Sequence, residues 1–594
     1  MALLAAILSI PVLAAEFEDE ILVTATRQPS PLKDVLPSSQ VFTQEDIERL
    51  QPKDLPSLIG RMSGVSFRDS GGRGSVSGVF IRGASTSQSI ILIDGVRTSS
   101  ATVGATALEG IPIESIERVE LVKGPLSGLY GADAVGGVIQ IFTKKGRQQR
   151  LTPQIHVGYR TDDTQEYAVE LGAGNERGAF HATFAYENSA GLDRTTIKTG
   201  GNADRDGLDE FALNISASYR LSDQLMTQFT LLRTDSHSEF DNLFGTDANF
   251  DSDTKIENNA LKFTYIPSEK LRLSLAASHF VDESTTPVFG LDITARRTSF
   301  SFQSDYQVQA DHALSLGVEY YDDKVDTLSN FAVTSRDNIG GFLLWQGRYG
   351  KLSTVGSVRY DDNEVYGDQT NGSFAMKYNF WDDFAATVSY GTAFRAPSFN
   401  DLFFPGFGNP NVQPEESETV EVSFNGKHFG AGWRISGYYT EVKDLIGFDF
   451  LTFTANNTAE ATLQGVELEL SYSMADWTIN ASTGYLDARD ETADEYLDDR
   501  AEFSADVDLH RRFNRLDLSM DVQAESGRHD SGGTTIDGFV IFGASANYRF
   551  NERFRLSGRI DNIFDENYTL NLATSADVFR TYGRTALISL HAFY

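Results

Sequence analysis

The feature that most constrains the fold is an alternation of apolar and polar residues that recurs from about residue 153 to the end of the chain. Because successive side chains of a β-strand point to opposite faces, each run of about ten such residues predicts one strand with an apolar face and a polar face. The clearest runs come in pairs joined by very short turns: Val466–Met474 with Trp477–Tyr485, Phe542–Phe550 with Phe554–Ile560, and Phe211–Tyr219 with Leu225–Leu231.

The connections between these runs distinguish a barrel from other all-β folds. Very short turns alternate with long acidic loops, a pattern typical of a transmembrane β-barrel, whereas the alternatives are a soluble β-sandwich or propeller. The final run, Ala586–Tyr594, has one apolar face and ends on an aromatic residue, and it resembles the last strand of bacterial outer-membrane barrels. At roughly 20 residues per strand and connection, the region predicts about 22 antiparallel strands, whose lumen needs a plug.

Composition excludes several classes of function. The formal net charge of −34 argues against nucleic acid as a partner and suits cations or neutral ligands. The chain has no cysteine, so disulfides, thiolate zinc sites and cysteine nucleophiles are excluded. No apolar run reaches the length of about 18 residues that predicts a membrane helix. No motif brings the 9 histidines into a catalytic arrangement, so we expect no enzyme activity.

The first 146 residues differ from the rest of the chain. Residues 1–15 (MALLAAILSIPVLAA) have the short apolar core and small final residues of a secretory signal peptide, the alternative being a buried N-terminal helix. After a segment at 16–30, residues 31–146 predict a small mixed α/β domain, which is the expected plug of a barrel formed by residues 147–594. Its expected elements are a helix over Glu45–Ile59 broken at Pro52, and strands at Gly78–Ile81, Ile90–Ile93, Arg118–Val122 and Val138–Phe142.

Seven motifs, taken together and in this order, resemble the TonB-dependent outer-membrane receptor family over the whole mature chain. They are VFIRG (Val79–Gly83), LIDGV (Leu92–Val96), the long run Ile116–Lys145, YGTAFRAPS (Tyr390–Ser398), GNPNVQPEESE (Gly408–Glu418), QGVELE (Gln464–Glu469) and DNIFDENY (Asp561–Tyr568). Within the family, the early LVTATR, the spacing of the plug and the run Gly432–Asp449 are most similar to members that import cobalamin.

This resemblance implies a monomeric transporter in the bacterial outer membrane, surrounded by lipid and lipopolysaccharide and energised by the periplasmic protein TonB. A short β-branched segment on the N-terminal side could add as a strand to the edge of a sheet in TonB. The alternative is an ordinary first strand of the plug. The implied TonB box consists of Glu20, Ile21, Leu22, Val23, Thr24 and Ala25.

The resemblance also implies an ionic lock between plug and barrel. Arg82 and Arg118 lie in plug motifs, and Glu421 and Glu467 lie in the barrel. Buried opposite charges hold two parts together strongly, because removing one partner leaves the other uncompensated. The alternative is a set of solvated surface charges.

Aspartates between residues 193 and 253 give the clearest substrate-related prediction. They lie in two loops on either side of the Phe211–Leu231 hairpin, so both loops emerge at the same rim. Carboxylates that converge without histidine or cysteine suit calcium, and cobalamin importers resemble this arrangement. The alternative is solvated acid on an extracellular loop. The implied calcium ligands are Asp193, Asn202, Asp204, Asp206, Asp241 and Asp253, with Asp251 as the alternative to the last.

The ligand positions implied by the resemblance are mostly small residues of the plug's apical loops: Val76, Gly78, Ser85, Val103 and Gly104, joined by Arg500 and a polar stretch near His529 in the barrel. The expected function is TonB-energised import of cobalamin or a related corrinoid. A ferric-siderophore or haem receptor is the alternative, although residues 394–415 contain no histidine to bind haem. A passive porin or an adhesin would need neither plug nor TonB box.

Overall fold

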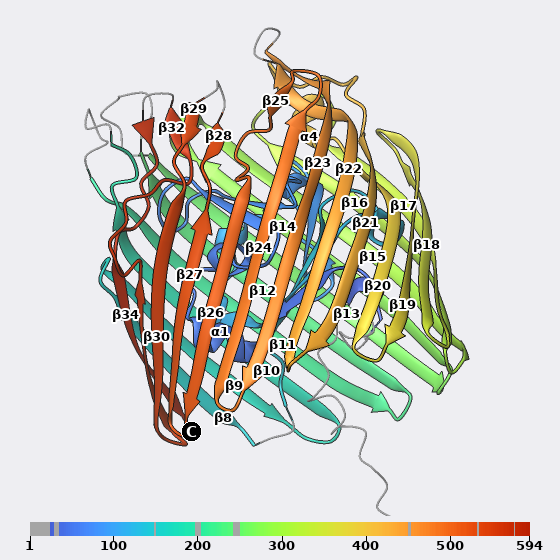
Figure 1. The fold of residues 1–594 in the computed structure, drawn as a ribbon. Helices are drawn as coiled ribbons and strands as arrows, with labels where there is room; N and C mark the ends of the chain where they lie inside the picture. Colours follow the sequence, from blue (N-terminus) through green and yellow to red (C-terminus); the bar gives the residue numbers. More distant parts are fainter. Residues whose placement is uncertain are drawn as a thin grey trace, which may run out of the picture.

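The computed structural model describes residues 24–28, 35–147, 150–196, 204–241, 250–449, 453–530, 534–574 and 577–594. The predicted signal peptide lies outside these ranges. Within them, a small N-terminal domain is enclosed by a barrel of long tilted strands (Figure 1). No helix in the described ranges is long and apolar enough to cross a membrane.

The barrel of 22 antiparallel strands confirms the predicted fold class. Each strand pairs with the next along the chain, and β34 pairs with β8 to close the sheet. The strands are β8 (Thr152–Arg160), β9 (Thr164–Gly174), β10 (Gly178–Leu192), β11 (Asp206–Ser222), β12 (Leu225–Phe240), β13 (Phe250–Ser268), β14 (Leu271–Thr286), β15 (Leu291–Gln309), β16 (His312–Thr327), β17 (Ser335–Tyr349), β18 (Leu352–Asn363), β19 (Gly367–Trp381), β20 (Phe384–Arg395), β21 (Glu415–His428), β22 (Ala431–Asp449), β23 (Thr454–Met474), β24 (Trp477–Asp490), β26 (Phe503–Phe513), β27 (Leu516–Glu525), β30 (Phe539–Asn551), β31 (Phe554–Asp561) and β34 (Thr585–Phe593).

Shorter strands and helices lie at the end of the barrel that carries the long loops. They are the short strands β25 (Glu495–Tyr496), β28 (Arg528–Asp530), β29 (Thr534–Ile536), β32 (Leu572–Thr574) and β33 (Asp577–Val578), with helices α4 (Phe399–Phe403) and η6 (Pro287–Phe289). The opposite rim has the tight turns.

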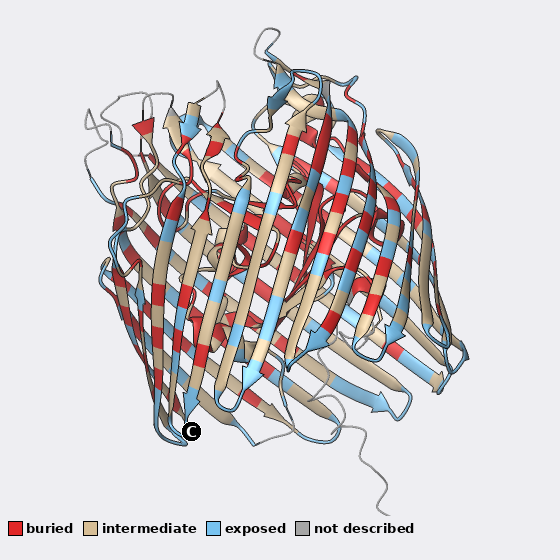
Figure 2. Cartoon of the chain, in the orientation of Figure 1, coloured by how far each residue is buried: buried red, intermediate tan, exposed pale blue. Residues whose placement is uncertain are grey.

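The alternation read from the sequence corresponds to the two faces of the barrel wall. Figure 2 shows buried and more exposed positions alternating along the strands. Val466 and Leu470 on β23 are exposed on the outer face, whereas Glu467 between them is buried toward the plug. The outer face is therefore apolar where lipid would cover it, and the inner face is polar.

The plug contains a mixed five-stranded sheet in the order β1-β6-β7-β4-β5, in which only β4 and β7 are parallel. Its strands are β1 (Ser39–Phe42), β4 (Ser89–Ile93), β5 (Val96–Arg97), β6 (Ile116–Lys123) and β7 (Gly137–Thr143); a separate hairpin is formed by β2 (Val65–Asp69) and β3 (Ser77–Ile81). The helices are α1 (Gln44–Leu50), α2 (Leu55–Ile59), α3 (Ser127–Tyr130), η1 (Thr24–Thr26), η3 (Thr86–Gln88), η4 (Leu108–Gly110) and η5 (Ile113–Ser115).

The helix expected over Glu45–Ile59 is two helices, and the break lies where proline was expected to cause it. Thr43 and Asp46 form a capping box at the start of α1, and Asp54 and Ser57 form another at the start of α2. Both helices pack their apolar side chains on the sheet, and Leu55, Leu58 and Ile59 are fully buried there. The plug thus has a small apolar core of its own.

Candidate functional site

The plug is fastened to the barrel wall by a buried ionic lock around Arg82. Its guanidinium donates to both carboxylate oxygens of Glu467, from Nε to Oε1 and from Nη2 to Oε2, each at 3.0 Å. A third donor, Nη1, lies 2.8 Å from Oε2 of Glu421, and the guanidinium also lies over the Tyr438 ring at 4.3 Å. All three charged side chains are buried, so the solvated-surface alternative does not describe them.

Lys123, which the sequence analysis missed, completes the lock. Its Nζ donates to Oε2 of Glu467 at 2.8 Å, to Oε1 of Glu469 at 2.9 Å and to the Ser63 carbonyl at 3.1 Å. The lysine is fully buried at the end of β6, and Glu469 follows Glu467 on the same face of β23. The alternation of QGVELE could have indicated this second inward glutamate.

Arg118, in contrast, does not reach the barrel glutamates that the lock prediction assigned to it. Its Nε donates to Oε1 of Glu120 at 2.8 Å, and its guanidinium stacks 3.6 Å from the centre of the Phe142 ring. Both contacts stay within the plug, because Arg118 lies in mid-strand on β6, next to the neighbouring strand β7.

Further ion pairs join plug and barrel around the lumen. Arg49 on α1 pairs with Asp508 on β26, and Arg61 Nη1 lies 2.9 Å from Oδ2 of Asp521 on β27. On β21, a few strands away in the same wall, Oε2 of Glu415 accepts a hydrogen bond from Gln88 Nε2 at 2.6 Å. Apolar clusters cross the interface as well, for example Phe67 of the plug with Phe539 and Leu570 of the barrel, so the plug is held by both polar and apolar contacts.

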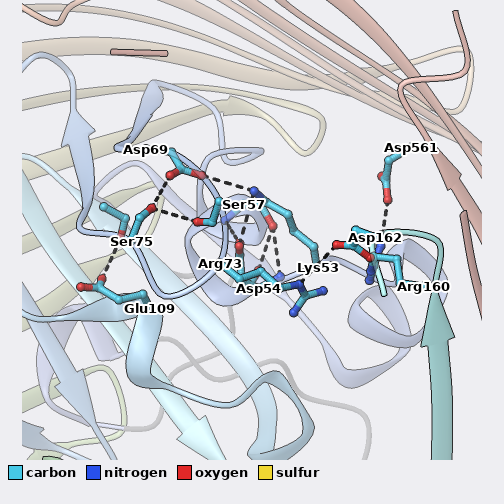
Figure 3. A network of polar contacts seen from close by, with 12 residues as sticks. Lys53, Asp54, Ser57, Asp69, Arg73, Ser75, Glu109, Arg160, Asp162 and Asp561 are labelled. Carbon is cyan, nitrogen blue, oxygen red and sulfur yellow. Dashed lines mark hydrogen bonds and ion pairs between the residues drawn. The ribbon is translucent and has the colours of Figure 1, made fainter. Parts of the chain in front are cut away.

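A polar cavity of about 50 Å³ lies between the plug and strands β9–β11, large enough for a few water molecules. Figure 3 shows the network beside it, in which Lys53 Nζ lies 3.4 Å from Oδ2 of Asp69 and 3.6 Å from Oδ2 of Asp54. Burial alone would lower the pKa of Lys53, but the two aspartates raise it overall. For Glu109 in η4, no such cation is found among the described residues, and burial raises the pKa of its carboxyl to about 7.

The predicted TonB box falls mainly outside the described residues, which begin at Thr24. Thr24 and Ala25 belong to the short helix η1 and not to an extended strand, and Ala25 is buried in a cluster with Leu129 and Tyr130. The next residues are anchored to the wall. Arg27 Nη1 pairs with Oε1 of Glu319 at 2.6 Å, and the Arg27 guanidinium lies 4.4 Å from the Tyr130 ring centre.

Four of the six implied calcium ligands gather at one rim. Asp206 begins β11, its Oδ2 accepts from the Arg194 backbone at 3.1 Å, and it interacts electrostatically with Asp204 and Asp241. Burial raises the pKa of Asp241, and the charges of Asp193 and Asp204 raise it further. The carboxylate of Asp241 is buried beside Thr195, whose hydroxyl and backbone oppose the rise in its pKa, and no ion pair to it is present among the described residues.

The remaining implied calcium ligands do not join this group. Asn202 lies outside the described residues. Asp253 is on strand β13, where its Oδ1 lies 2.8 Å from Nδ1 of His237 on β12, and its side chain is exposed. Asp251, the alternative calcium ligand, lies two residues earlier on the same strand. Its side chain therefore points to the same face of the sheet as that of Asp253. The loop between β12 and β13 is shorter than the sequence suggested, since β13 begins at Phe250.

Of the implied ligand positions, Val76 and Val103 stand at the surface of the plug, 67% and 52% exposed. Gly78 is in β3, Ser85 caps η3, and Gly104 has a positive φ of 73° in a tight turn. Arg500 is turned inward: its Nε donates to the Gly83 carbonyl at 3.0 Å and its guanidinium lies over Phe80. Burial lowers the pKa of Arg500 to about 10.

Comparison with known families agrees with this geometry. Residues 143–563 match the family model described as TonB dependent receptor-like, beta-barrel, and residues 31–138 match the TonB-dependent receptor plug domain. The first match alone covers more than half of the chain. The chain is a TonB-dependent receptor.

Curated relatives cover nearly the whole receptor. The vitamin B12 transporter BtuB of Photobacterium profundum is 30% identical over 567 residues, which is 93% of this chain and 92% of the relative. BtuB of Vibrio cholerae is 28% identical over 580 residues, which is 93% of each chain. The family resemblance read from the seven motifs is thereby confirmed, and the receptor belongs to the outer membrane.

Solved structures with the same fold include receptors for other ligands. The siderophore receptor PirA of Acinetobacter baumannii superposes with a TM-score of 0.81 at 16% identity, covering 94% of this chain and 98% of that one. The ferric enterobactin receptor PfeA of Pseudomonas aeruginosa gives 0.79 at 16% identity, covering 94% and 100%. At this identity the likeness concerns the fold alone. The family is one of transporters and receptors and not a class of enzymes.

Proposed function

We propose that this receptor imports cobalamin or a related corrinoid across the outer membrane, with energy supplied through TonB. The observation that carries the proposal is the similarity to vitamin B12 transporters over 93% of the chain, which includes the plug and most of the barrel. The rim aspartates support it, because a cluster of anionic side chains suits a calcium ion beside a ligand that is not itself strongly anionic.

Calcium would be held by Asp193, Asp204, Asp206 and Asp241, which come from the two ends of the β10–β11 loop and from the end of β12. The buried carboxylate of Asp241 fits this role, since hydrogen bonds from Thr195 do not neutralise its charge and a buried charge is costly without a counter-ion. A hard divalent cation takes six to eight oxygen ligands and would tie the two loops together.

The ligand would rest on the exposed apical residues of the plug, near Val76 and Val103, under loops ordered by calcium. Arg500 would act by fixing the Gly83 turn beneath, because its guanidinium is already engaged there. Binding must favour one plug arrangement over another to have any effect on the periplasmic side, since a ligand shifts an equilibrium only through differential affinity.

Coupling to TonB would involve residues 20–25 and the Arg27–Glu319 ion pair that follows them. Release of this pair would free the segment to add as a strand to TonB by backbone hydrogen bonding. A pull on the segment would then act on the plug, whose lock around Arg82 resists it. The receptor performs no covalent chemistry in this scheme.

The test is equilibrium binding of cyanocobalamin to the purified full-length receptor in detergent, with calcium or with a calcium chelator. We expect chelation to weaken binding at least tenfold, and Asp206→Asn to weaken it to the same extent and to abolish the calcium effect. Asp253→Asn is the matched control and should leave the calcium effect intact, because Asp253 is paired with His237 away from the cluster.

The possible outcomes separate the two parts of the proposal. Tight binding that does not depend on calcium would contradict the metal site but support corrinoid as the ligand. Absence of binding in both conditions would contradict corrinoid import, and growth on ferric siderophores under iron starvation would then be measured. Retention of heat-modifiable migration on gels confirms that each variant still forms the barrel.

A further inference from the structure

A second group of metal-ligating side chains lies inside the lumen, away from the rim aspartates. Glu114 comes from the plug helix η5, His156 from β8 and Glu166 from β9. One ligand atom from each of these residues lies within 4.8 Å of the other two. Plug and barrel thus contribute jointly to one cluster, and it contains a histidine where the rim group has none.

The position of the histidine allows ligation. Its Nδ1 lies 3.3 Å from Nδ1 of His591 on β34, and in the tautomer in which His156 Nδ1–H donates to His591, Nε2 of His156 keeps its lone pair for the cluster. That atom, Nε2, is buried and makes no hydrogen bond of normal length within the described part of the chain, although it lies 3.5 Å from Oε2 of Glu166. A metal-ligating histidine is normally held through its other ring nitrogen in this way.

Glu166 is oriented in a similar manner. Its Oε1 lies 3.4 Å from both Arg73 and Arg160, whereas Oε2 faces Nε2 of His156 at 3.5 Å. This separation is long for a hydrogen bond. It matches the edge of a tetrahedron around zinc, which is about 3.4 Å when each metal–ligand bond is about 2.1 Å.

Glu114 completes the group from the plug. No ion pair or side-chain hydrogen bond to its carboxylate is present among the described residues, although it lines the polar cavity beside Arg73 and Glu166. A half-buried carboxylate without an ion pair has lost part of its hydration without compensation. A divalent cation would neutralise Glu114 together with the free oxygen of Glu166.

We propose that Glu114, His156 and Glu166 bind a divalent transition-metal ion of the zinc class. Imidazole and carboxylate together suit zinc, whereas calcium takes oxygen ligands only, so the site differs in chemistry from the rim aspartates. Three protein ligands leave a fourth position for water from the adjoining cavity.

Occupancy of the site would fasten η5 of the plug to two strands of the barrel. The tie would lie close to the point where the plug continues into the barrel, because the Lys144 backbone donates to the Ser115 carbonyl at 2.8 Å. A bound ion would therefore restrain the part of the plug next to its covalent connection.

The test is calorimetric binding of Zn²⁺ to the full-length receptor, stripped of metal and then saturated with calcium, with metal content measured by mass spectrometry. We expect one zinc per chain, bound at least tenfold more weakly in His156→Ala and in Glu114→Gln. His181→Ala is the matched control, because His181 also faces a lumen glutamate, Glu170, but at 3.3 Å and with Lys144 already bound to that glutamate.

X-ray absorption of the zinc-loaded protein adds a second readout and should show nitrogen from histidine beside oxygen ligands. Unchanged zinc affinity in both His156→Ala and Glu114→Gln would overturn the proposal, as would the absence of zinc binding to the unmodified receptor. Heat-modifiable migration shows whether each variant still folds, and a Glu114→Gln variant that folds and binds normally would exclude the plug's part in the site.

Discussion

At the scale of single residues, Arg82 is the centre of the plug–barrel contact. A guanidinium presents donors in a fixed fork, which is why one arginine can hold two carboxylates from different strands at once. Lysine at the same position could offer charge but not this geometry. Lys123 instead approaches Glu467 from a separate direction, so the glutamate is satisfied from two sides.

Removal of the charge from Glu467 should release the lock. Glu467→Gln leaves Arg82 and Lys123 partly uncompensated in a buried place, and breaking such a pair costs about 3–5 kcal/mol. We expect the plug of this variant to unfold at a lower urea concentration than the plug of the unmodified receptor. Unfolding is measured with a fluorophore attached to the plug. Arg118→Gln is the control, since its contacts stay within the plug; an equal loss there would contradict the special role of the lock.

Glu109 should make the stability of the plug depend on pH. Its pKa is raised to about 7 by burial, against an ordinary value of 4.5, so the folded plug binds more protons than the unfolded chain between these values. Stability should therefore fall as pH rises from about 4.5 to 7. Glu109→Gln should make this fall smaller, whereas Glu45→Gln, with an exposed side chain, should leave it unchanged; parallel curves for all three proteins would refute the assignment.

At the scale of elements, the turn between α2 and β2 shows how the backbone makes room for the lock. Gly64 has a positive φ of 70°, and a Cβ there would lie only 1.9 Å from Oε1 of Glu467. The Arg82 backbone also donates to the Gly64 carbonyl at 2.8 Å. The turn thus brings plug and barrel glutamate together without a side chain between them.

Two glycine substitutions separate backbone strain from this contact. Gly64→Ala should lower the stability of the plug in two ways, because alanine is strained at this φ and its Cβ clashes with Glu467. Gly95 has a similar φ of 87°, but no atom lies within 4 Å of a Cβ built there. Gly95→Ala should therefore lower the stability of the plug through backbone strain alone. We expect a clearly larger drop in the urea midpoint of the plug for Gly64→Ala. Equal drops would mean that the clash is relieved by movement of the glutamate.

The elements themselves could largely be predicted from the sequence, because alternation and turns are local. β23 ends at Met474 and β24 begins at Trp477, as the apolar periodicity of that hairpin indicates. The lock partner Lys123 and the anchor Arg27 were not predicted, because their partners are hundreds of residues away along the chain and, unlike for Arg82, the family resemblance did not pair them with the barrel. The rim aspartates could be predicted in part. Hairpin geometry places both loops at one rim, but Asp253 belongs to β13, where the strand register directs its exposed side chain toward His237.

At the scale of the whole molecule, the closed sheet depends on the final strand. β34 pairs with β31 on one side and with β8 on the other, and the Tyr594 backbone donates to the Pro153 carbonyl at 3.0 Å. A chain that lacks residues 585–594 has no strand to bridge β31 and β8. The barrel would then keep two unpaired edges, each with free backbone donors and acceptors.

Truncation before Thr585 should therefore prevent barrel formation altogether and not merely weaken it. We expect the truncated chain to lose heat-modifiable migration on gels and to be degraded in cells. The control is deletion of residues 531–533, which connect β28 and β29 in the sequence; because those two strands form a sheet separate from the barrel, this deletion should leave barrel formation intact. A truncated chain that still migrates as a compact barrel would contradict the bridging role of β34.

The pairing of β34 with β8 also makes closure of the barrel depend on a complete chain. Every other joint in the ring links strands that are neighbours in the sequence, so it can form while synthesis or export is unfinished. This one brings the last-made strand to the first strand of the barrel. A chain interrupted before β34 therefore remains an open sheet with two exposed edges, so the barrel closes only when its last strand is present.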